Sequence, residues 1–129
     1  MSKSDYAEDK VNELLVGKTA FTLPTAYVAL YTAAPSDSGG GTEVSGGSYA
    51  RKQTAGADWA ASSGGSIANA NAITFVTATA SWGTVTHFGV HDASTSGNLL
   101  FWAALTTSKT IGSGDTASFA AGALVHTET

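Results

Sequence analysis

Short apolar segments alternate with turn-forming residues throughout the C-terminal half of the sequence, from Ile73 to Thr127. Val, Ile, Phe, Trp and Thr favour extended strands, whereas clusters of Gly, Asn, Asp and Ser favour the turns between them. The apolar groups at 85–90 and 99–102 lie on either side of one such turn, at 92–98. The pattern predicts an antiparallel sheet with strands near 73–77, 85–91, 99–105, 116–119 and 123–127.

The first half of the chain predicts one earlier strand and then long loops. Residues 27–32 alternate along the segment YVALYT, and Pro35 ends it because proline cannot donate to a β-ladder. Residues 35–72 contain eight of the 15 glycines and few aliphatic residues, which predicts glycine-rich loops. Further short strands are expected near 48–54 and 58–61.

These segments give roughly seven or eight strands whose spacing suits two packed antiparallel sheets better than a parallel α/β sheet. We therefore expect a mainly β fold, an antiparallel β-sandwich of jelly-roll or Greek-key type with a short N-terminal α-helix. With 129 residues the chain is expected to form a single domain over 1–129.

The N-terminal segment has the pattern of a short amphipathic helix over about 4–17. Ser4 is a good N-cap residue, and Gly17 stands where a left-handed C-cap residue belongs. One narrow apolar stripe lies at helical spacing and includes Val11, Leu14 and Leu15. The stripe predicts either a helix that covers one end of the sheet or a helix that docks on a partner subunit.

The composition excludes several classes of protein. The chain has 6 Lys and Arg against 10 Asp and Glu, so it lacks the basic face that nucleic-acid binding requires. It has no cysteine, which excludes disulfides and thiolate zinc sites. The N-terminus lacks the pattern of a signal peptide, and the longest apolar run is far shorter than a membrane span. We expect neither nucleic acid nor a membrane as a partner.

The side chains that could support catalysis do not form a known motif. His87 and His91 are four residues apart, which on a strand separates them by roughly 13 Å and leaves no shared metal site. Ser113, His91 and Asp92 are the residue types of a triad, but no serine stands in a nucleophile-elbow pattern. We expect no enzymatic activity, no cofactor and no metal. A pH effect of His87, His91 and His126 on assembly stays open, because histidine titrates near neutrality.

Four longer segments resemble a known family. They are YVALYTAAP, TEVSGGSYARK, TASWGTVTHFGVHDA and GDTASFAAG, and with the N-terminal helix they extend over most of the chain. They are similar to small virion proteins of tailed bacteriophages, which are labelled tail-fibre-like or act as capsid decoration (cement) proteins. The resemblance implies a non-enzymatic structural protein of the virion, assembled in the bacterial host cytoplasm, and it brings no catalytic residues.

From this resemblance we expect a capsid decoration protein that binds the assembled shell as a homotrimer, with the major capsid protein or another virion protein as its partner. The alternatives are a tail or neck fibre module and a carbohydrate-binding module for host attachment. A surface with few charges and many small residues allows close packing, and symmetry multiplies weak contacts. The candidate interface residues are Val11, Leu14, Leu15, Tyr49, Arg51, Trp59 and Trp82.

Four of these candidates have a second interpretation within the chain itself. Tyr49 and Trp59 are expected either to anchor their loops or to contact a partner. Trp82 precedes Gly83 at a turn, where it either packs inward or is an exposed contact. Arg51 is either an interface cation or an ordinary arginine that is solvated or paired within the domain.

Overall fold

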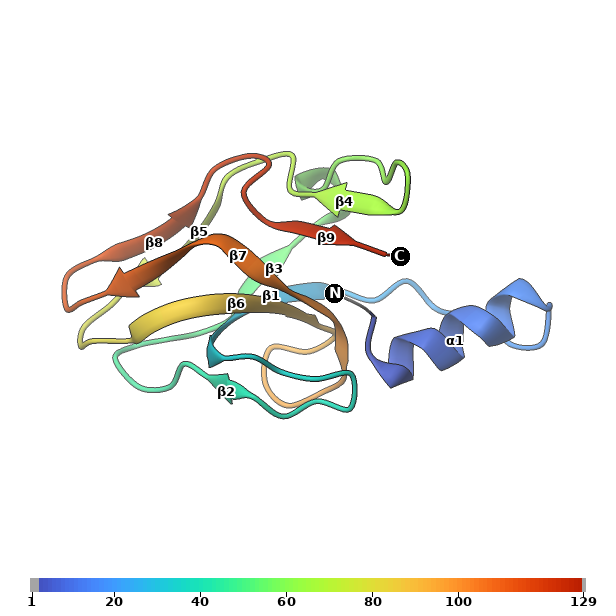
Figure 1. Cartoon of the computed structure of the whole chain (residues 1–129), viewed down its shortest axis with the longest axis horizontal. Helices are drawn as coiled ribbons and strands as arrows, with labels where there is room; N and C mark the ends of the chain where they lie inside the picture. The colour runs from blue at the N-terminus through green and yellow to red at the C-terminus, as the bar shows by residue number, and fades with distance from the viewer. Residues whose placement is uncertain (1–2, 129) are drawn as a thin grey trace.

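The computed structural model describes residues 3–128 and shows a mainly β fold with one α-helix projecting from one end (Figure 1). The elements are α1 (Asp5–Leu15), β1 (Ala26–Ala33), β2 (Thr42–Glu43), β3 (Lys52–Thr54), a 3-10 turn (Gly56–Asp58), β4 (Ser66–Ala68), β5 (Ile73–Thr77), β6 (Gly83–His91), β7 (Leu99–Ile111), β8 (Thr116–Phe119) and β9 (Val125–Thr127).

The strands form one larger sheet and two small ones. The larger sheet has the order β2-β1-β6-β7, and β3 also pairs with β1. The small sheets pair β4 with β9 and β5 with β8, and every pairing in the described chain is antiparallel. The mainly β class, the antiparallel pairing and the short N-terminal helix are confirmed. The jelly-roll or Greek-key sandwich stays a prediction with which this arrangement is consistent.

One face of the larger sheet packs into the hydrophobic core. The core side chains of β1 and β6 alternate along each strand and include Val28, Leu30, Phe88 and Val90. The strands β5 and β8 supply the facing residues Ile73, Phe75 and Phe119. Each such side chain stabilises the fold by about 1.5–3 kcal/mol when fully buried. The core therefore holds the sheets together and leaves the second face of the larger sheet available for other roles.

That second face is covered by loops. Ala29 and Tyr31 of β1 point to it, yet they are only 0% and 4% exposed. The chain after β1 folds back over them, and the indole Nε1 of Trp102 in β7 donates to the Asp37 carboxylate at 3.2 Å. Gly41 allows this return, since its φ is +75° and a Cβ there would lie 2.7 Å from the Pro35 nitrogen. The sheet and these loops enclose the pocket described in the next subsection.

The helix is joined to the β-sheet body at its first turn. The Ser4 hydroxyl accepts from the Ala7 amide at 3.2 Å and donates to the Leu99 carbonyl, while the Ser4 amide donates to Leu100 at 2.9 Å. Gly17 has a φ of +74°, which suits the left-handed end of a helix. Within residues 3–128, no helix has the length and apolar character needed to cross a bilayer.

The structure differs from the sequence predictions mainly in the glycine-rich region. The strand expected at 48–54 starts only at Lys52, because Gly46, Gly47 and Ser48 all have positive φ. The strand expected at 58–61 is wrong: a 3-10 turn ends at Asp58, whose carboxylate accepts from the Ala55 amide at 2.9 Å, and beyond it only Trp59 forms an isolated bridge, to Asn69. β2 and β4 were not predicted.

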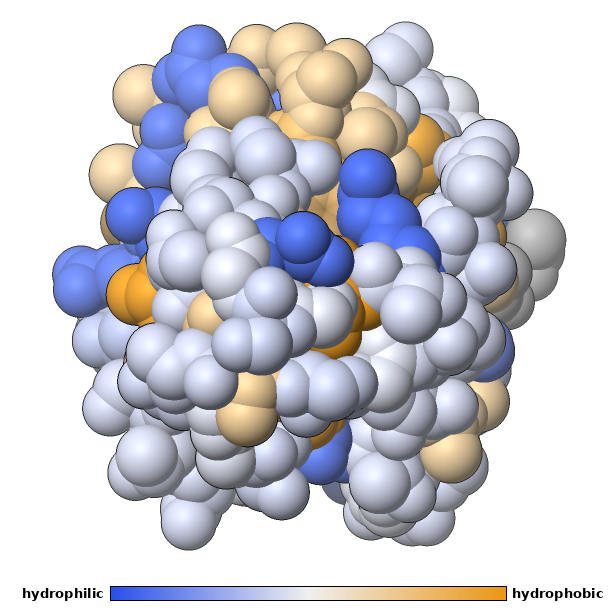
Figure 2. All heavy atoms as spheres, turned by 90° about the vertical axis from the view of Figure 1, so that its left-hand side faces the viewer, coloured by the Kyte–Doolittle hydropathy of each residue, from blue (hydrophilic) through white to orange (hydrophobic). Residues whose placement is uncertain are grey.

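The end of the molecule opposite α1 consists largely of near-neutral residues, as Figure 2 shows. Strongly hydrophobic residues appear on that face only as small separate areas. The strands of this region are joined by cross-strand hydroxyl pairs: Thr74–Ser118 at 2.8 Å, Thr77–Thr116 at 2.7 Å and Thr84–Thr110 at 3.0 Å. This visible face offers no large strongly hydrophobic surface to a partner.

Candidate functional site

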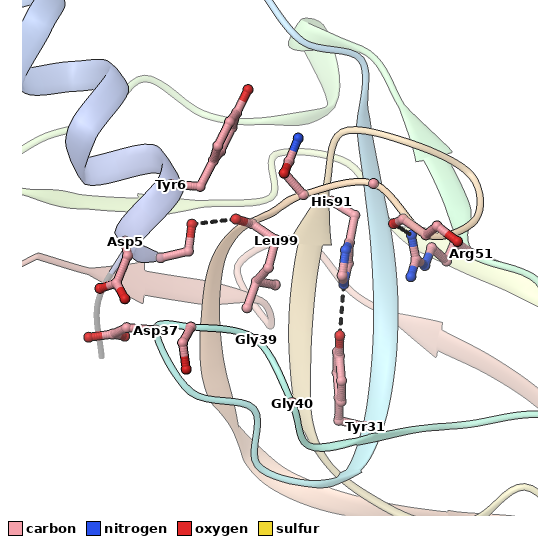
Figure 3. Close-up of a pocket in the computed structure, with 14 residues that line it drawn as sticks. Asp5, Tyr6, Tyr31, Asp37, Gly39, Gly40, Arg51, His91 and Leu99 are labelled. Atoms are coloured by element: carbon pink, nitrogen blue, oxygen red, sulfur yellow. Dashed lines mark hydrogen bonds between the residues drawn. The ribbon is translucent and has the colours of Figure 1, made fainter.

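The first candidate site is a polar pocket under the loops on the second face of the larger sheet. It has a volume of about 530 Å³ and lies between the start of α1, the loop after β1, the end of β6 and the loop that follows β6 (Figure 3). Its polar lining includes Ser4, Asp5, Tyr31, Asp37, Arg51 and His91.

A tyrosine and a histidine form the base of this pocket. Tyr31 Oη and His91 Nε2 are 2.7 Å apart, and the two rings lie nearly parallel (Figure 3). Gly89 lies beside them on the same strand as His91, and a Cβ there would come within 3.0 Å of the Tyr31 ring and of Leu99. Glycine at this position therefore lets both side chains lie flat across the sheet.

Burial moves the pKa values of this pair away from neutrality. Burial, with a smaller effect of the Glu43 carboxylate, raises the pKa of Tyr31 to about 12. Burial and the positive charge of Arg51 lower the pKa of His91 to about 4. His91 Nδ1 is buried and has no hydrogen-bond partner within residues 3–128. Neither ring is poised to exchange a proton at pH 7, as a general acid or base would need to be.

Arg51 is the centre of a buried polar cluster beside the pocket. Its guanidinium binds the Glu43 carboxylate through two hydrogen bonds, Nε to Oε2 at 2.9 Å and Nη2 to Oε1 at 2.8 Å. Its Nη1 donates to the carbonyl oxygens of Ala93 and Ser96, at 2.9 and 2.8 Å. Arg51 thus ties β2 to the loop after β6, and we call Arg51 with Glu43 and Tyr49 the clamp.

Tyr49 completes the clamp from the core side. Its hydroxyl donates to the Glu43 carboxylate at 2.7 Å and accepts from the Leu30 amide at 3.0 Å. Burial alone would raise the pKa of Glu43, but the hydrogen bonds from Arg51 and Tyr49 outweigh it and lower that pKa. The Glu43 carboxylate is therefore ionised and fully occupied by partners in its own chain, which indicates a structural role.

Other combinations of polar residues do not assemble into a reactive site. Ser113 donates to the Thr79 carbonyl at 3.2 Å, and Asp92 accepts from the Asn98 amide at 2.7 Å, so the structure does not join Ser113, His91 and Asp92. Among residues 3–128, no three His, Cys, Asp or Glu side chains are grouped to hold a metal ion.

Three aromatic or charged interface candidates pack within their own chain. Trp82 is 4% exposed, and its Nε1 donates to the Gly47 carbonyl at 2.9 Å, so it offers no open ring face to a sugar. The ring of Tyr49 packs edge-on against Trp82 at 5.3 Å between centroids. Trp59 is partly buried, with Nε1 donating to Thr54 at 3.0 Å. These contacts within the chain account for much of the surface of each side chain.

The second candidate site is the helix with the segment that returns from it. We call α1 and residues 16–25 the arm; Figure 1 shows it extending away from the sheets. The described chain has six exposed large apolar side chains, and four lie on the arm: Leu14 at 46%, Leu15 at 75%, Val16 at 77% and Leu23 at 93%. Of the predicted stripe, Val11 is half-buried while Leu14 and Leu15 face solvent. The structure thus separates the helix candidates from Tyr49, Arg51, Trp59 and Trp82.

Sequence reasoning missed parts of both sites. Val16 lies within the expected helix but outside the spacing of its apolar stripe, and Leu23 lies beyond Gly17, where the helical periodicity ends. Glu43 was missed because nothing in the local sequence links it to an arginine eight positions later.

Comparison with known proteins gives one informative match. Residues 2–127 match the family model described as Podophage GP4 fiber I protein gp80. No curated protein matches the chain. The family match extends over almost all of the sequence, including the arm and the clamp.

Proposed function

The chain belongs to the Podophage GP4 fiber I protein gp80 family and is a structural component of a bacteriophage virion, and from this membership we propose that it is part of a virion fibre. The observation that carries the proposal is the fibre named in the description of a family that matches residues 2–127. The protein would serve this role as one domain over 1–129.

The sequence alone favoured capsid decoration over a tail or neck fibre, and the family match supports the fibre alternative better. Nothing in the match supports a decoration role. The carbohydrate-binding alternative stays a prediction; a sugar would stack on exposed aromatic rings, and the Trp59 and Trp82 indoles both bond within the chain.

A passive, structural role is consistent with the chemistry of the pocket and the clamp. The Arg51 guanidinium and the Glu43 carboxylate satisfy each other at 2.8–2.9 Å, so neither is held ready for a substrate. The pKa of His91 is lowered to about 4 and that of Tyr31 is raised to about 12, which leaves no proton-transfer group near neutrality in that pair. We therefore propose that the protein is not an enzyme.

We propose further that the protein forms a homotrimer and binds another virion protein. Small, weakly charged surfaces pack closely at little desolvation cost, and repeated weak contacts add up in a symmetric assembly. The exposed leucines of the arm support a docking role for the arm, because single apolar residues scatter over most surfaces but clusters mark interfaces.

The location in the virion can be tested on purified particles. Antibody labelling of the particles in electron micrographs, with quantitative mass spectrometry of the protein, would give the position and the copy number. We expect label on an appendage and a copy number that is a multiple of three. Label spread over the whole head, with hundreds of copies, would favour the decoration role. Absence from the particle would contradict both.

A further inference from the structure

The tip of the arm presents an apolar protrusion. Leu14, Leu15 and Val16 are consecutive residues at the end of α1, with exposed fractions of 46%, 75% and 77%. We call these three residues the knob. The knob is flanked by one acid, Glu13, and one base, Lys18, which is exposed.

The base of the same arm contains a groove. It has a volume of about 350 Å³ and is lined by Tyr6, Lys10, Phe21, Leu23, Pro24 and Asp92, among others. Tyr6 and Phe21 form its aromatic wall, with centroids 6.5 Å apart and edge to face. The groove carries one base, Lys10, and one acid, Asp92, so its charges are the counterparts of those beside the knob.

Hydrogen bonds within its own chain fix the carboxylate of Asp92 in the groove. The Asp92 carboxylate accepts from the Asn98 amide at 2.7 Å and from the Asn98 side chain at 3.0 Å. Burial alone would raise the pKa of Asp92, but these hydrogen bonds outweigh it and lower the pKa. Unlike Glu43, this partly exposed carboxylate has hydrogen-bond donors but no cation in the salt bridges of residues 3–128, so a cation from outside can pair with it at the rim.

The knob cannot turn back into the groove of its own chain. The helix and the return segment are tied together near the tip, where the Thr19 hydroxyl donates to the Glu13 carboxylate at 2.9 Å and the Lys18 amide donates to the Glu13 carbonyl at 2.9 Å. At the base, the contact between Tyr6 and Phe21 holds the same two segments together. The knob and groove are therefore fixed at opposite ends of one arm.

We propose that the knob of one copy docks in the groove of a second copy, with Glu13 facing the neighbour's Lys10 and Lys18 facing the neighbour's Asp92. The proposal rests on the self-assembly proposed above and names its surface. Charge complementarity argues for a second copy, because an acid and a base flank the knob and a base and an acid line the groove of the same chain. A contact between unlike surfaces passes from copy to copy and closes into a ring when the rotation permits, as three copies would do.

The open edge of the larger sheet is a weaker candidate for joining copies. Its edge strand β7 carries an irregularity opposite 85–87, where residues 105–108 have no partners on β6. Lys109 follows, and its ammonium lies over the Phe119 ring at 5.3 Å from the centroid. An irregular strand and an inward-pointing lysine are features by which proteins prevent edge pairing.

Analytical ultracentrifugation of the purified full chain over a range of concentrations would measure its self-association. The variant Leu15→Gln with Val16→Gln removes the knob and is expected to weaken self-association by about a hundredfold. The matched control is Val76→Gln, which changes another exposed valine, 50% exposed on β5. It should leave association unchanged. Circular dichroism and thermal unfolding would verify that each variant is folded.

Charge exchange gives the sharper test. Glu13→Lys alone sets two cations against each other and should weaken association by about tenfold, as should Lys10→Glu. The double variant Glu13→Lys with Lys10→Glu restores opposite charges and should recover most of the loss. Equal association in all of these variants would overturn the proposal.

Incorporation into particles separates this proposal from the fibre assignment. A chain that self-associates through the arm but is missing from virions would contradict the fibre role and leave the docking surface intact. A chain that is monomeric at all concentrations, yet whose knob variant fails to enter virions, would overturn self-docking and indicate that another virion protein occupies the arm.

Discussion

The clamp buries a charged side chain, whereas the arm exposes apolar ones. In the clamp, the Arg51 side chain is only 7% exposed, and its nitrogens bind a carboxylate and two carbonyl oxygens. In the arm, Leu15 is 75% exposed and no part of the β-sheet body covers it. A charge buried with every partner in place indicates a finished structural element. An exposed leucine cluster is the kind of surface that assembly would complete, as we propose for the arm.

The same contrast separates the residues that hold the monomer from those that can join copies. Tyr49 and Arg51 are interface candidates from the sequence, and in the structure both donate hydrogen bonds to Glu43 of the same chain. Substitutions in the clamp should therefore change the free energy of unfolding, whereas substitutions at the arm tip should change association. The four predictions below test this division, starting with the largest expected effect.

Arg51→Met should destabilise the monomer by roughly 3 kcal/mol, the lower end of the range for a buried pair, because it leaves the partly buried Glu43 carboxylate without its cation. Urea unfolding at pH 7 would measure the change. Lys52→Met is the neighbouring control; Lys52 is exposed, and its replacement should alter the unfolding free energy by less than about 0.5 kcal/mol. Equal effects of the two variants would show that the clamp is not a stabilising element.

The pH dependence of stability tests the buried histidine. The pKa of His91 is lowered to about 4 in the fold, so between that value and its ordinary 6.5 the unfolded chain binds more protons. Stability should therefore fall as the pH drops from 6.5 towards 4, by up to about 3 kcal/mol. Urea midpoints at pH 5 and 7 would measure this, and His91→Gln should flatten the difference. A slope that persists in the variant would assign it to other groups.

Ser4→Ala tests the joint between the arm and the β-sheet body. Loss of the N-cap should destabilise the fold by about 1–2 kcal/mol, since the Ser4 hydroxyl serves both the Ala7 amide and the Leu99 carbonyl. Hydrogen exchange should then show faster opening of α1 than of the core strands. Ser45→Ala, at an exposed loop serine, is the control and should change neither quantity.

Leu15→Gln should give the smallest effect on the monomer, within about 0.5 kcal/mol, because glutamine is a good helix former and the leucine is already solvated. Unfolding would be measured at a concentration low enough to keep the chain monomeric. Leu30→Ala in the core provides the contrast and should cost about 2–5 kcal/mol. A large loss for Leu15→Gln would mean that the tip of the arm supports its own body.

The alternation of apolar and polar residues predicted a strand well where turn-forming residues flanked it on both sides. The strands β5 and β8 have the expected bounds because alternation and flanking turns agree there. The glycine-rich region was less predictable, since the positive φ of Gly47 goes with a close approach to Ala80 and Trp82, which are far away in the sequence. The clamp lay beyond sequence reasoning for a related reason: a salt bridge between Glu43 and Arg51 needs a register that only the folded sheet provides. The helix stripe was found, but its solvent exposure could not be read from its spacing.

The way in which α1 is rooted has a mechanical consequence for any assembly. Its N-terminal end is tied to the body through the Ser4 amide on Leu100 and the Asp5 amide on Asp37, both at 2.9 Å, and its far end is tied to the return segment that leads into β1. Its 11 residues form a rod about 16 Å long. A tilt of about 10° at that root displaces the far end by about 3 Å. A tilt of this kind would let one subunit meet partners at different curvatures without any rearrangement of its sheets.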